Sequence, residues 1–211
     1  MSARIAVVDY GMGNLRSVEK ALERTGAPVE VTSDGDRIRA ADGIVLPGVG
    51  AFPKAMRNLR ERGLDSLLVE EAGRGRPLLG ICLGMQLLFD HSAENEGSEG
   101  LGLLRGRVER LPAPNLKVPL IGWTAVHWDR RTPLVESLPD ACAFYFVHSF
   151  APTGVEEDDR LGTAEYGATF ICAVERGNIR GVQFHPEKSS GAGLRLLENF
   201  AGICAGVGAP S

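Results

Sequence analysis

The sequence lacks the cysteine patterns of metal, redox and disulfide-rich proteins. Its 211 residues hold only four cysteines, and no two of them have the Cys-x-x-Cys spacing of zinc and dithiol redox sites. Cys142 and Cys172 lie in apolar, strand-like runs. This placement favours reduced thiols in a core over a disulfide framework. We therefore predict a cytoplasmic protein with no metal site and no cofactor.

Long apolar segments, basic clusters and phosphate-binding loops are also missing. No apolar run approaches the roughly 20 residues of a membrane-spanning helix. Met1 leads directly into an apolar run, so we expect no signal peptide. The net charge is -4 and lysine and arginine do not cluster, which argues against a nucleic-acid surface. No Gly-x-x-x-x-Gly-Lys loop occurs, and Gly11-x-Gly13 lacks the third glycine of a dinucleotide fingerprint. We expect neither nucleic acid nor a membrane as a partner.

What the sequence does contain, up to Phe89, is an alternation of apolar strands and amphipathic helices. Strands are expected at 4–8, 29–32, 43–46 and 78–81, and helices at 14–25, 51–62 and 64–72. Alternation of this kind predicts βαβ units and therefore a parallel sheet.

Beyond Phe89 the pattern becomes richer in strands. We expect 91–100 to be a polar surface loop and 156–159 to be the solvated tip of a hairpin. Strands are expected at 108–111, 120–127, 143–150, 161–166, 170–175 and 179–184, followed by a last helix at 189–205. The prediction is an α/β fold with a mostly parallel central sheet flanked by helices and a β-rich antiparallel extension. We expect residues 1–211 to form a single domain.

Cys82 occupies the junction between an apolar strand and a helix. The apolar run ends at Ile81, and Met85 to Phe89 are expected to form the first turns of a buried helix. Gly80 and Gly84 flank the cysteine by two residues on either side, which permits a sharp strand-to-helix turn. A helix N-terminus supplies N–H groups that stabilise a thiolate or an oxyanion. Cys82 is therefore a candidate nucleophile, with a buried structural cysteine as the alternative.

His185 and Glu187 follow another predicted strand. Pro186 excludes helix at His185, and residues two apart in an extended or turning backbone can share a side. Glu187 can then accept from one imidazole nitrogen while the other nitrogen faces a thiol, as in a catalytic triad. The alternative is a loop histidine with a structural role.

Two glycine-bearing turns are expected near the same edge of the sheet. In Pro47-Gly48-Val49-Gly50 the two glycines leave the Gly48–Val49 peptide free to flip, which suits an oxyanion hole; a plain turn is the alternative. The loop from Tyr10 to Asn14 follows the first strand, and loops at the carboxyl ends of parallel strands are commonly functional.

These motifs together resemble a known family. Gly-Ile-Cys-Leu-Gly-Met-Gln around Cys82 and Gln-Phe-His-Pro-Glu-Lys-Ser around His185 resemble the class I glutamine amidotransferases, which use a Cys-His-Glu triad on a flavodoxin-like fold. The runs 8–15 and 46–50 look like those of the glutaminase subunits of imidazole glycerol phosphate synthase, in histidine biosynthesis. The resemblance covers nearly the whole chain, with the motifs in matching order.

The resemblance implies a role for each matching residue. Cys82 attacks the side-chain amide of L-glutamine, His185 transfers the protons, and Glu187 orients the imidazole. The N–H groups of Leu83 and Val49 form the oxyanion hole, Leu83 because it directly follows the nucleophile. The residues implied to hold the glutamine are Gly50, Gln86, Ser149 and Phe150. His148, which precedes Ser149, is expected to be a wall or core histidine rather than a catalytic one.

The resemblance also implies a partner. Subunits of this family form a heterodimer with a (β/α)8-barrel cyclase, which uses the ammonia to make imidazole glycerol phosphate and an aminoimidazole carboxamide ribonucleotide. We expect Tyr10, Asn14 and Lys188 at this interface, because they follow strand ends on the side of Cys82; Trp123 is a further candidate. The alternatives are a glutaminase subunit of another biosynthetic synthase, a free-standing cysteine hydrolase of the same fold, and a regulatory module without activity.

Overall fold

The computed structural model describes residues 3–206, so the predicted leader-free start at Met1 and Ser2 lies outside it. The central element is a nine-stranded sheet in the order β2-β1-β3-β4-β13-β12-β11-β8-β9. Its parallel part consists of β1 (Ile5–Val8), β2 (Val29–Thr32), β3 (Gly43–Gly48), β4 (Leu78–Cys82) and β13 (Ile179–Val182). Its antiparallel part consists of β8 (Leu120–Trp128), β9 (Ala141–His148), β11 (Arg160–Glu165) and β12 (Thr169–Arg176). The predicted architecture is confirmed.

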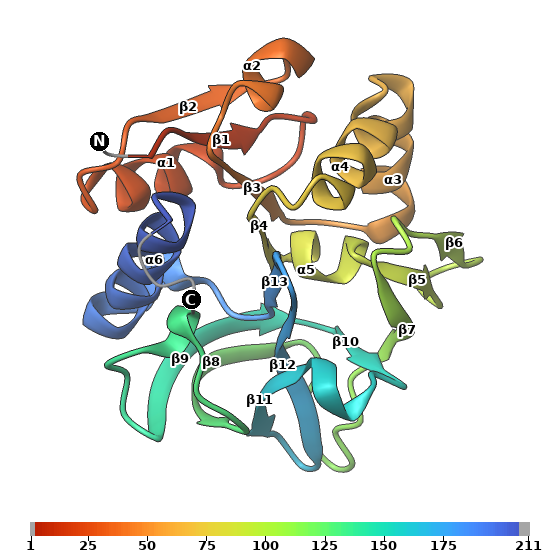
Figure 1. Cartoon of the computed structure of the whole chain (residues 1–211). Helices are drawn as coiled ribbons and strands as arrows, with labels where there is room; N and C mark the ends of the chain where they lie inside the picture. The colour runs from red at the N-terminus through yellow and green to blue at the C-terminus, as the bar shows by residue number, and fades with distance from the viewer. Residues whose placement is uncertain (1–2, 207–211) are drawn as a thin grey trace.

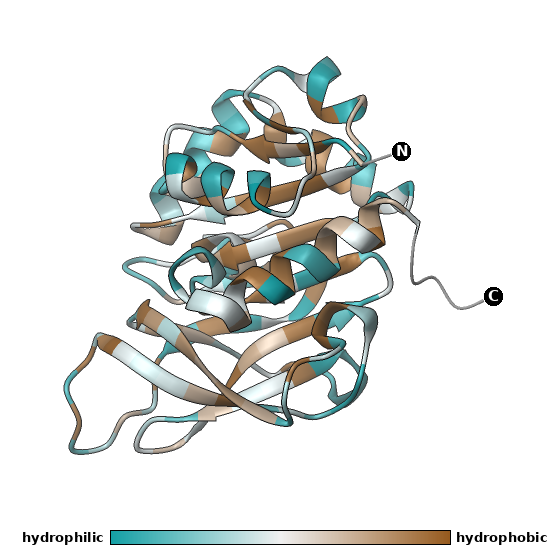
Figure 2. Ribbon diagram, turned by 90° about the vertical axis from the view of Figure 1, so that its left-hand side faces the viewer, coloured by the Kyte–Doolittle hydropathy of each residue, from teal (hydrophilic) through white to brown (hydrophobic). Residues whose placement is uncertain are grey.

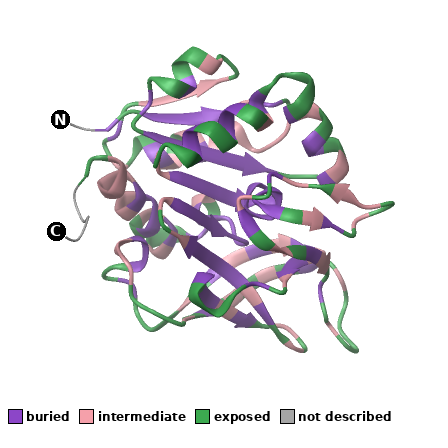
Figure 3. Ribbon diagram, turned by 45° about the vertical axis from the view of Figure 1, so that its right-hand side comes forward, coloured by how far each residue is buried: buried purple, intermediate pink, exposed green. Residues whose placement is uncertain are grey.

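Helices cover both faces of the parallel part (Figure 1). The helices of one face are α1 (Leu15–Glu23) and α6 (Ser190–Cys204), and those of the other are α2 (Gly35–Arg39), α3 (Phe52–Glu61) and α4 (Leu64–Gly73). Consecutive strand residues point to opposite faces, so Val7 packs with the α1–α6 core while Ala6 and Val8 pack with the α2–α4 core. A strand buried on both sides needs a continuous apolar run, which explains the brown strands of Figure 2 and the purple ones of Figure 3.

A second, four-stranded sheet corrects part of the prediction. It contains β5 (Phe89–Ser92), β6 (Ser98–Glu99), β7 (Leu104–Arg110) and β10 (Phe150–Thr153). The helix after Cys82, α5 (Leu83–Leu87), is shorter than expected, because Phe89 already belongs to a strand that pairs with β7. The stretch 91–100 likewise contains the end of β5 and all of β6 rather than only a loop. The segment expected at 143–150 is divided at Ser149 between β9 and β10.

The acidic stretch 156–159 is also different from the prediction. It contains a short 3-10 helix, η2 (Glu157–Asp159), and Asp159 is buried instead of solvated. Its Oδ1 accepts from Arg176 Nε at 2.9 Å, and this ion pair satisfies a charge that burial would otherwise destabilise. The remaining 3-10 helices are η1 (Pro133–Val135) and η3 (Pro186–Lys188). Within residues 3–206, no helix is long and apolar enough to cross a bilayer.

Candidate active site

Cys82 lies at a strained turn between β4 and α5, as the sequence predicts. Its φ of 55° and ψ of -110° are rare for a residue with a side chain, and strain of this kind concentrates at functional sites. Gly80 and Gly84, which flank Cys82, have backbone atoms so close to them that a side chain would not fit. A Cβ on Gly84 would lie 1.7 Å from the Leu46 carbonyl oxygen, and one on Gly80 would lie 2.7 Å from the Gly84 oxygen. The turn therefore fits only because both neighbours are glycine.

His185 and Glu187 form a buried pair behind the cysteine. Because β13 runs parallel to β4, the chain leaves β13 at the edge of the sheet where Cys82 lies, and η3 then turns Glu187 back towards His185. His185 Nδ1 is 2.8 Å from Glu187 Oε1, and the two side chains are 2% and 0% exposed. A carboxylate only accepts, so the Nδ1–H donates to it and Nε2 is left to take a proton.

The charge state of His185 follows from these neighbours. Burial alone lowers the pKa of His185, but hydrogen bonding and charge attraction from Cys82 and Glu187 outweigh it and raise the pKa to about 9. In this structure His185 Nε2 has no hydrogen-bond partner, although Cys82 is close enough to raise the pKa of the imidazole. Catalytic hydrogen bonds often close only when substrate binds. The pair favours an imidazolium at His185 near neutral pH.

The turn that follows β3 lies beside the nucleophile. β3 pairs with β4 so that Gly48 is opposite Cys82, and a Cβ on Gly48 would lie 2.8 Å from Leu83 Cβ. Val49 is 39% exposed and lines the same cavity as Leu83. The fold therefore brings both predicted oxyanion residues to the nucleophile.

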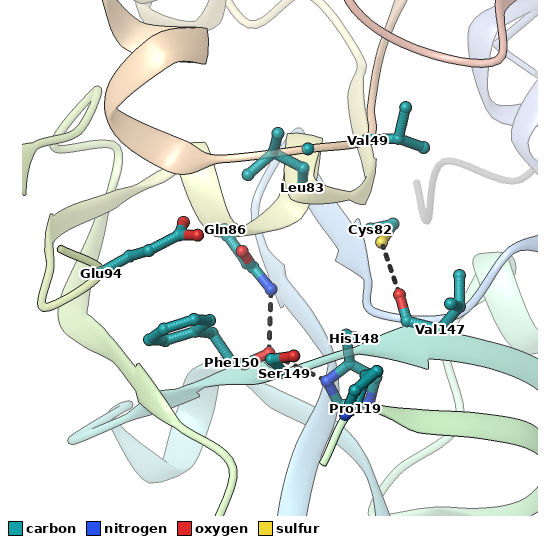
Figure 4. Close-up of a pocket in the computed structure, with 11 residues that line it drawn as sticks. Val49, Cys82, Leu83, Gln86, Glu94, Pro119, Val147, His148, Ser149 and Phe150 are labelled. Atoms are coloured by element: carbon teal, nitrogen blue, oxygen red, sulfur yellow. Dashed lines mark hydrogen bonds between the residues drawn. The ribbon is translucent and has the colours of Figure 1, made fainter.

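A cavity of about 290 Å³ opens onto Cys82 (Figure 4). The residues expected to hold glutamine all line it, namely Gly50, Gln86, Ser149 and Phe150. Gln86 points across the cavity towards Phe150, and its Nε2 donates to the Phe150 carbonyl at 2.9 Å. A small cavity with a few polar groups suits a ligand the size of an amino acid.

Glu94 is a cavity residue that the sequence analysis missed. It comes from the stretch between β5 and β6, which was expected to be a solvated loop. Its Oε2 accepts from the Phe52 N–H at 2.7 Å, so the carboxylate is held at the N-terminus of α3 while it faces the cavity. This contact joins residues 42 positions apart, and no local pattern indicates it.

His148 is a wall of the cavity, in agreement with the prediction. Its Nδ1 lies 2.9 Å from the Phe150 carbonyl oxygen and therefore carries the hydrogen that it donates there. Burial chiefly, and the nearby His185, lower the pKa of His148 to about 4. His148 is neutral at pH 7 and holds the Phe150 carbonyl in place.

The interface prediction fails for Tyr10, which does not reach the surface. Its side chain is 0% exposed, and its hydroxyl donates to the Pro47 carbonyl at 2.8 Å. The ring is apolar enough to enter the core between β1 and the β3 turn once its hydroxyl has this acceptor. Burial, and then the charge of Cys82, raise the pKa of Tyr10. Asn14 is half-buried at the start of α1, whereas Lys188 is exposed, with its Nζ 5.9 Å from the centre of the Tyr145 ring.

Replacing Tyr10 with phenylalanine is expected to loosen the turn that carries Val49. The Pro47 carbonyl would lose its partner inside the core, which costs about 1–3 kcal/mol of unfolding free energy. Denaturant unfolding measures this loss, and turnover of glutamine, the substrate that the family resemblance implies, should fall severalfold. Tyr166→Phe is the matched control, because its hydroxyl bonds the Lys117 carbonyl at an exposed site. Equal effects of the two changes on turnover would contradict the assignment of Tyr10.

Comparison with known proteins agrees with this geometry. Residues 6–204 match the family model described as "Glutamine amidotransferase class-I". The chain belongs to the class I glutamine amidotransferases. It is 53% identical over 204 residues to the "Imidazole glycerol phosphate synthase subunit HisH" of Moorella thermoacetica, covering 97% of each chain. It is 51% identical over 198 residues to the protein of the same name in Symbiobacterium thermophilum, covering 94% of this chain and 93% of the other.

Two solved structures superpose on this amidotransferase over almost their whole length. The structure entitled "Structure of PurLQS from Thermotoga maritima" has a TM-score of 0.77 at 20% identity, covering 96% of this chain and 99% of that chain. Another, entitled "Crystal structure of glutamine amidotransferase", has a TM-score of 0.75 at 22% identity. At these identities the likeness establishes the fold alone.

Proposed function

We propose that this amidotransferase is the glutaminase subunit of an imidazole glycerol phosphate synthase. It hydrolyses L-glutamine to glutamate and ammonia through Cys82, His185 and Glu187, and works as one domain in the cytoplasm. The observation that carries the proposal is the 2.8 Å contact of buried His185 and Glu187 behind a strained cysteine that opens onto a cavity. The names of the HisH relatives, at about half identity, support the same assignment.

The first half of the reaction forms a thioester. The Cys82 thiolate attacks the side-chain amide carbon of glutamine, and the amide oxygen gains negative charge. The N–H groups of Leu83 and Val49 receive that oxyanion, Leu83 because the first N–H groups of a helix have no partner within it. His185 then gives its Nε2 proton to the nitrogen of the tetrahedral intermediate. The carbon–nitrogen bond breaks, and ammonia leaves a γ-glutamyl thioester on Cys82.

The second half returns the enzyme to its starting state. A water molecule attacks the thioester carbon while neutral His185 accepts one of its protons. The carbon–sulfur bond breaks, glutamate leaves, and the thiolate–imidazolium pair is restored. Throughout, Glu187 keeps the proton on Nδ1 and stabilises the cation, since its carboxylate can only accept.

The polar wall of the cavity fits the amino-acid end of glutamine. Both hydrogens of the Gln86 amide are already engaged, one by the Phe150 carbonyl and one by Gln183 Oε1. Gln86 can therefore offer only its oxygen, which suits the α-ammonium group, and Glu94 adds a carboxylate at the same cavity. Gly50 and Ser149 are left for the α-carboxylate.

The partner that we propose is a (β/α)8-barrel cyclase, with which the chain forms a heterodimer. Near the cavity the surface carries apolar side chains that a monomer would normally bury: Ile121 is 62% exposed and Trp123 is 53% exposed. Trp123 packs edge-on against Tyr145, with ring centres 6.1 Å apart, and Lys188 lies over the same tyrosine. Ammonia released beside such a patch passes into the partner rather than into water. The cyclase then forms imidazole glycerol phosphate and an aminoimidazole carboxamide ribonucleotide.

A coupled assay tests this proposal against its alternatives. The chain is purified with its natural partner, and the transfer of nitrogen from amide-labelled glutamine into the cyclase product is measured. Transfer that depends on both proteins is the expected result. Full glutaminase activity of the chain alone would favour a free-standing hydrolase. Activity only with a different synthase would favour another biosynthetic pathway.

Lys188→Ala is expected to weaken the control of hydrolysis by the partner. We propose that the Gly48–Val49 peptide turns its N–H into the oxyanion hole only when the cyclase has bound its own ligand. Lys188 directly follows the triad glutamate and is exposed, so a carboxylate of the partner can pair with it and set this loop. Stimulation by the cyclase ligand should fall roughly 5-fold or more.

Lys20→Ala is the control, since Lys20 is exposed on α1 and pairs with Glu23. Unchanged stimulation and unchanged affinity would remove Lys188 from the coupling.

A further inference from the structure

A line of buried amides connects the cavity wall to the nucleophile. Gln183, which follows β13, is 0% exposed, and its Nε2 donates to Cys82 Sγ at 3.7 Å. Its Oε1 accepts from Gln86 Nε2 at 3.0 Å. The same Gln86 nitrogen donates to the Phe150 carbonyl at 2.9 Å. Three hydrogen bonds thus connect the Phe150 carbonyl to the sulfur. Gln86 is 64 positions from Phe150 and 97 positions from Gln183 in the chain.

The far end of this line decides which way each amide faces. The oxygen and nitrogen of a glutamine amide are told apart by their partners, and a backbone carbonyl can only accept. Gln86 must therefore present its nitrogen to Phe150, and the second hydrogen of that nitrogen then requires the oxygen of Gln183. The Phe150 carbonyl is itself held by a second donor, His148 Nδ1, at 2.9 Å. Gln183 is left with its N–H group towards Cys82.

The sulfur therefore lies between a donor and an acceptor. A thiolate accepts hydrogen bonds strongly, whereas a neutral thiol is a weak acceptor and a weak donor. The N–H of Gln183 favours the ionised sulfur. The Val147 carbonyl, 3.9 Å from Sγ, can bond only to the S–H form. The charge on Cys82 depends on which of these two contacts is stronger, in addition to the contribution of His185.

We propose that Gln183 is a positioning residue that holds the Cys82 sulfur in its ionised, attacking form, with its donor polarity imposed through Gln86 by the Phe150 carbonyl. This inference rests on the proposed function, in which that thiolate attacks glutamine. It gives Gln86 two tasks: Gln86 faces the substrate on one side and fixes the orientation of Gln183 on the other.

The test is the pH profile of Cys82 alkylation by iodoacetamide in the purified chain. Gln183→Met keeps the length of the side chain and removes both the donor and the acceptor. Cys142 and Cys204 are only partly buried, so the label must be counted on the peptide that contains Cys82. We expect the midpoint of the profile to rise by about one pH unit, so that alkylation at a pH below both midpoints becomes about tenfold slower. In the complex, kcat should fall about tenfold while KM changes less than threefold, because the glutamine contacts remain.

Gln86→Met provides a second arm. Without Gln86 the Gln183 amide loses its fixed orientation, so the alkylation midpoint should rise by a smaller amount and KM should rise as well. The double variant should match Gln183→Met alone in its alkylation midpoint, because Gln86 reaches the sulfur only through Gln183. Additive shifts in the double variant would overturn the relay.

An alkylation profile of Gln183→Met that equals the native one, in a chain with the native melting temperature, would overturn the inference. If Gln183→Met does not fold, Gln183→Asn replaces it, because an amide one carbon shorter cannot span both Gln86 and Cys82; the same shift is expected and the same absence of a shift refutes it. Alkylation of Cys82 can be measured whether or not the chain hydrolyses glutamine. A shifted profile in a chain that shows no glutaminase activity with its partner would refute the proposed function alone. An unshifted profile in a chain whose complex is active would refute this inference alone.

Discussion

Replacing Cys82 with serine should abolish glutamine hydrolysis in the complex while folding and partner binding persist. A serine hydroxyl remains un-ionised beside His185, so the attacking group is lost, and losses of triad nucleophiles reach roughly 10⁴-fold or more. The side chains are nearly equal in size, so the strained turn at φ 55° is retained. Glutamate release measures hydrolysis, and co-purification measures binding. The control is Cys142→Ser on β9, outside the residues that line the cavity, which should hydrolyse glutamine normally.

The same variant separates hydrolysis from synthesis. With free ammonium salt in place of glutamine, the complex containing Cys82→Ser should still make the cyclase product, because the cyclase receives its nitrogen directly. Glutamate release near the native rate would refute Cys82 as the nucleophile. Failure of the ammonia-dependent reaction would mean that the chain contributes more than ammonia to the partner.

His185→Ala is expected to be much more damaging than Glu187→Gln. His185 moves a proton in each half-reaction, so its loss should lower kcat by roughly 10³-fold or more, whereas Glu187 orients and stabilises the imidazole. Initial rates of glutamate release at saturating glutamine measure both variants. If Glu187→Gln proved the more damaging change, the roles of the two residues would have to be exchanged.

The raised pKa of His185 predicts how stability and activity change with pH, and how Glu187→Gln alters that change. The pKa of His185 is raised from 6.5 to about 9. The charged His185 therefore stabilises the fold fully below about pH 6.5, and this contribution is lost as the pH rises through about 9. The imidazolium also supplies the proton for ammonia, so kcat should fall on the alkaline side near pH 9. Glu187→Gln removes one cause of the raised pKa, and the alkaline limb should move to lower pH. A limb that stays in place would show that another group limits the rate.

The parts of the site that the sequence predicts are those with local causes. Glycines two residues from Cys82 and a proline between His185 and Glu187 restrict the backbone within a few residues, and the structure has the predicted turn and the predicted His185–Glu187 pair. The oxyanion turn follows from the register of neighbouring parallel strands, in which Gly48 is opposite Cys82.

The parts that the sequence does not predict depend on distant contacts. Tyr10 is buried because the Pro47 carbonyl, 37 positions away, accepts from its hydroxyl. Glu94 faces the cavity because it bonds the Phe52 N–H. Gln183 is a polar residue in an otherwise apolar stretch, and only its position between Gln86 and Cys82 gives it a chemical role. In each case a polar group is placed by a partner that no local pattern identifies.

Cys82 ends a strand, β4, that lies beside β13 in the middle of the buried sheet, and this position affects how fast the backbone there opens. The amides of β4 and β13 lie in the middle of the sheet, so they exchange only in the openings that unfold the core. Val49, one residue beyond β3, is exposed and can reorient without breaking the ladder. The nucleophile at the end of β4 is thus part of the most slowly opening region of the protein, while the second proposed oxyanion donor lies one residue beyond the end of β3. If the partner acts through the Gly48–Val49 peptide, as we propose, it reorganises only the end of β3 and leaves the buried core of the sheet intact.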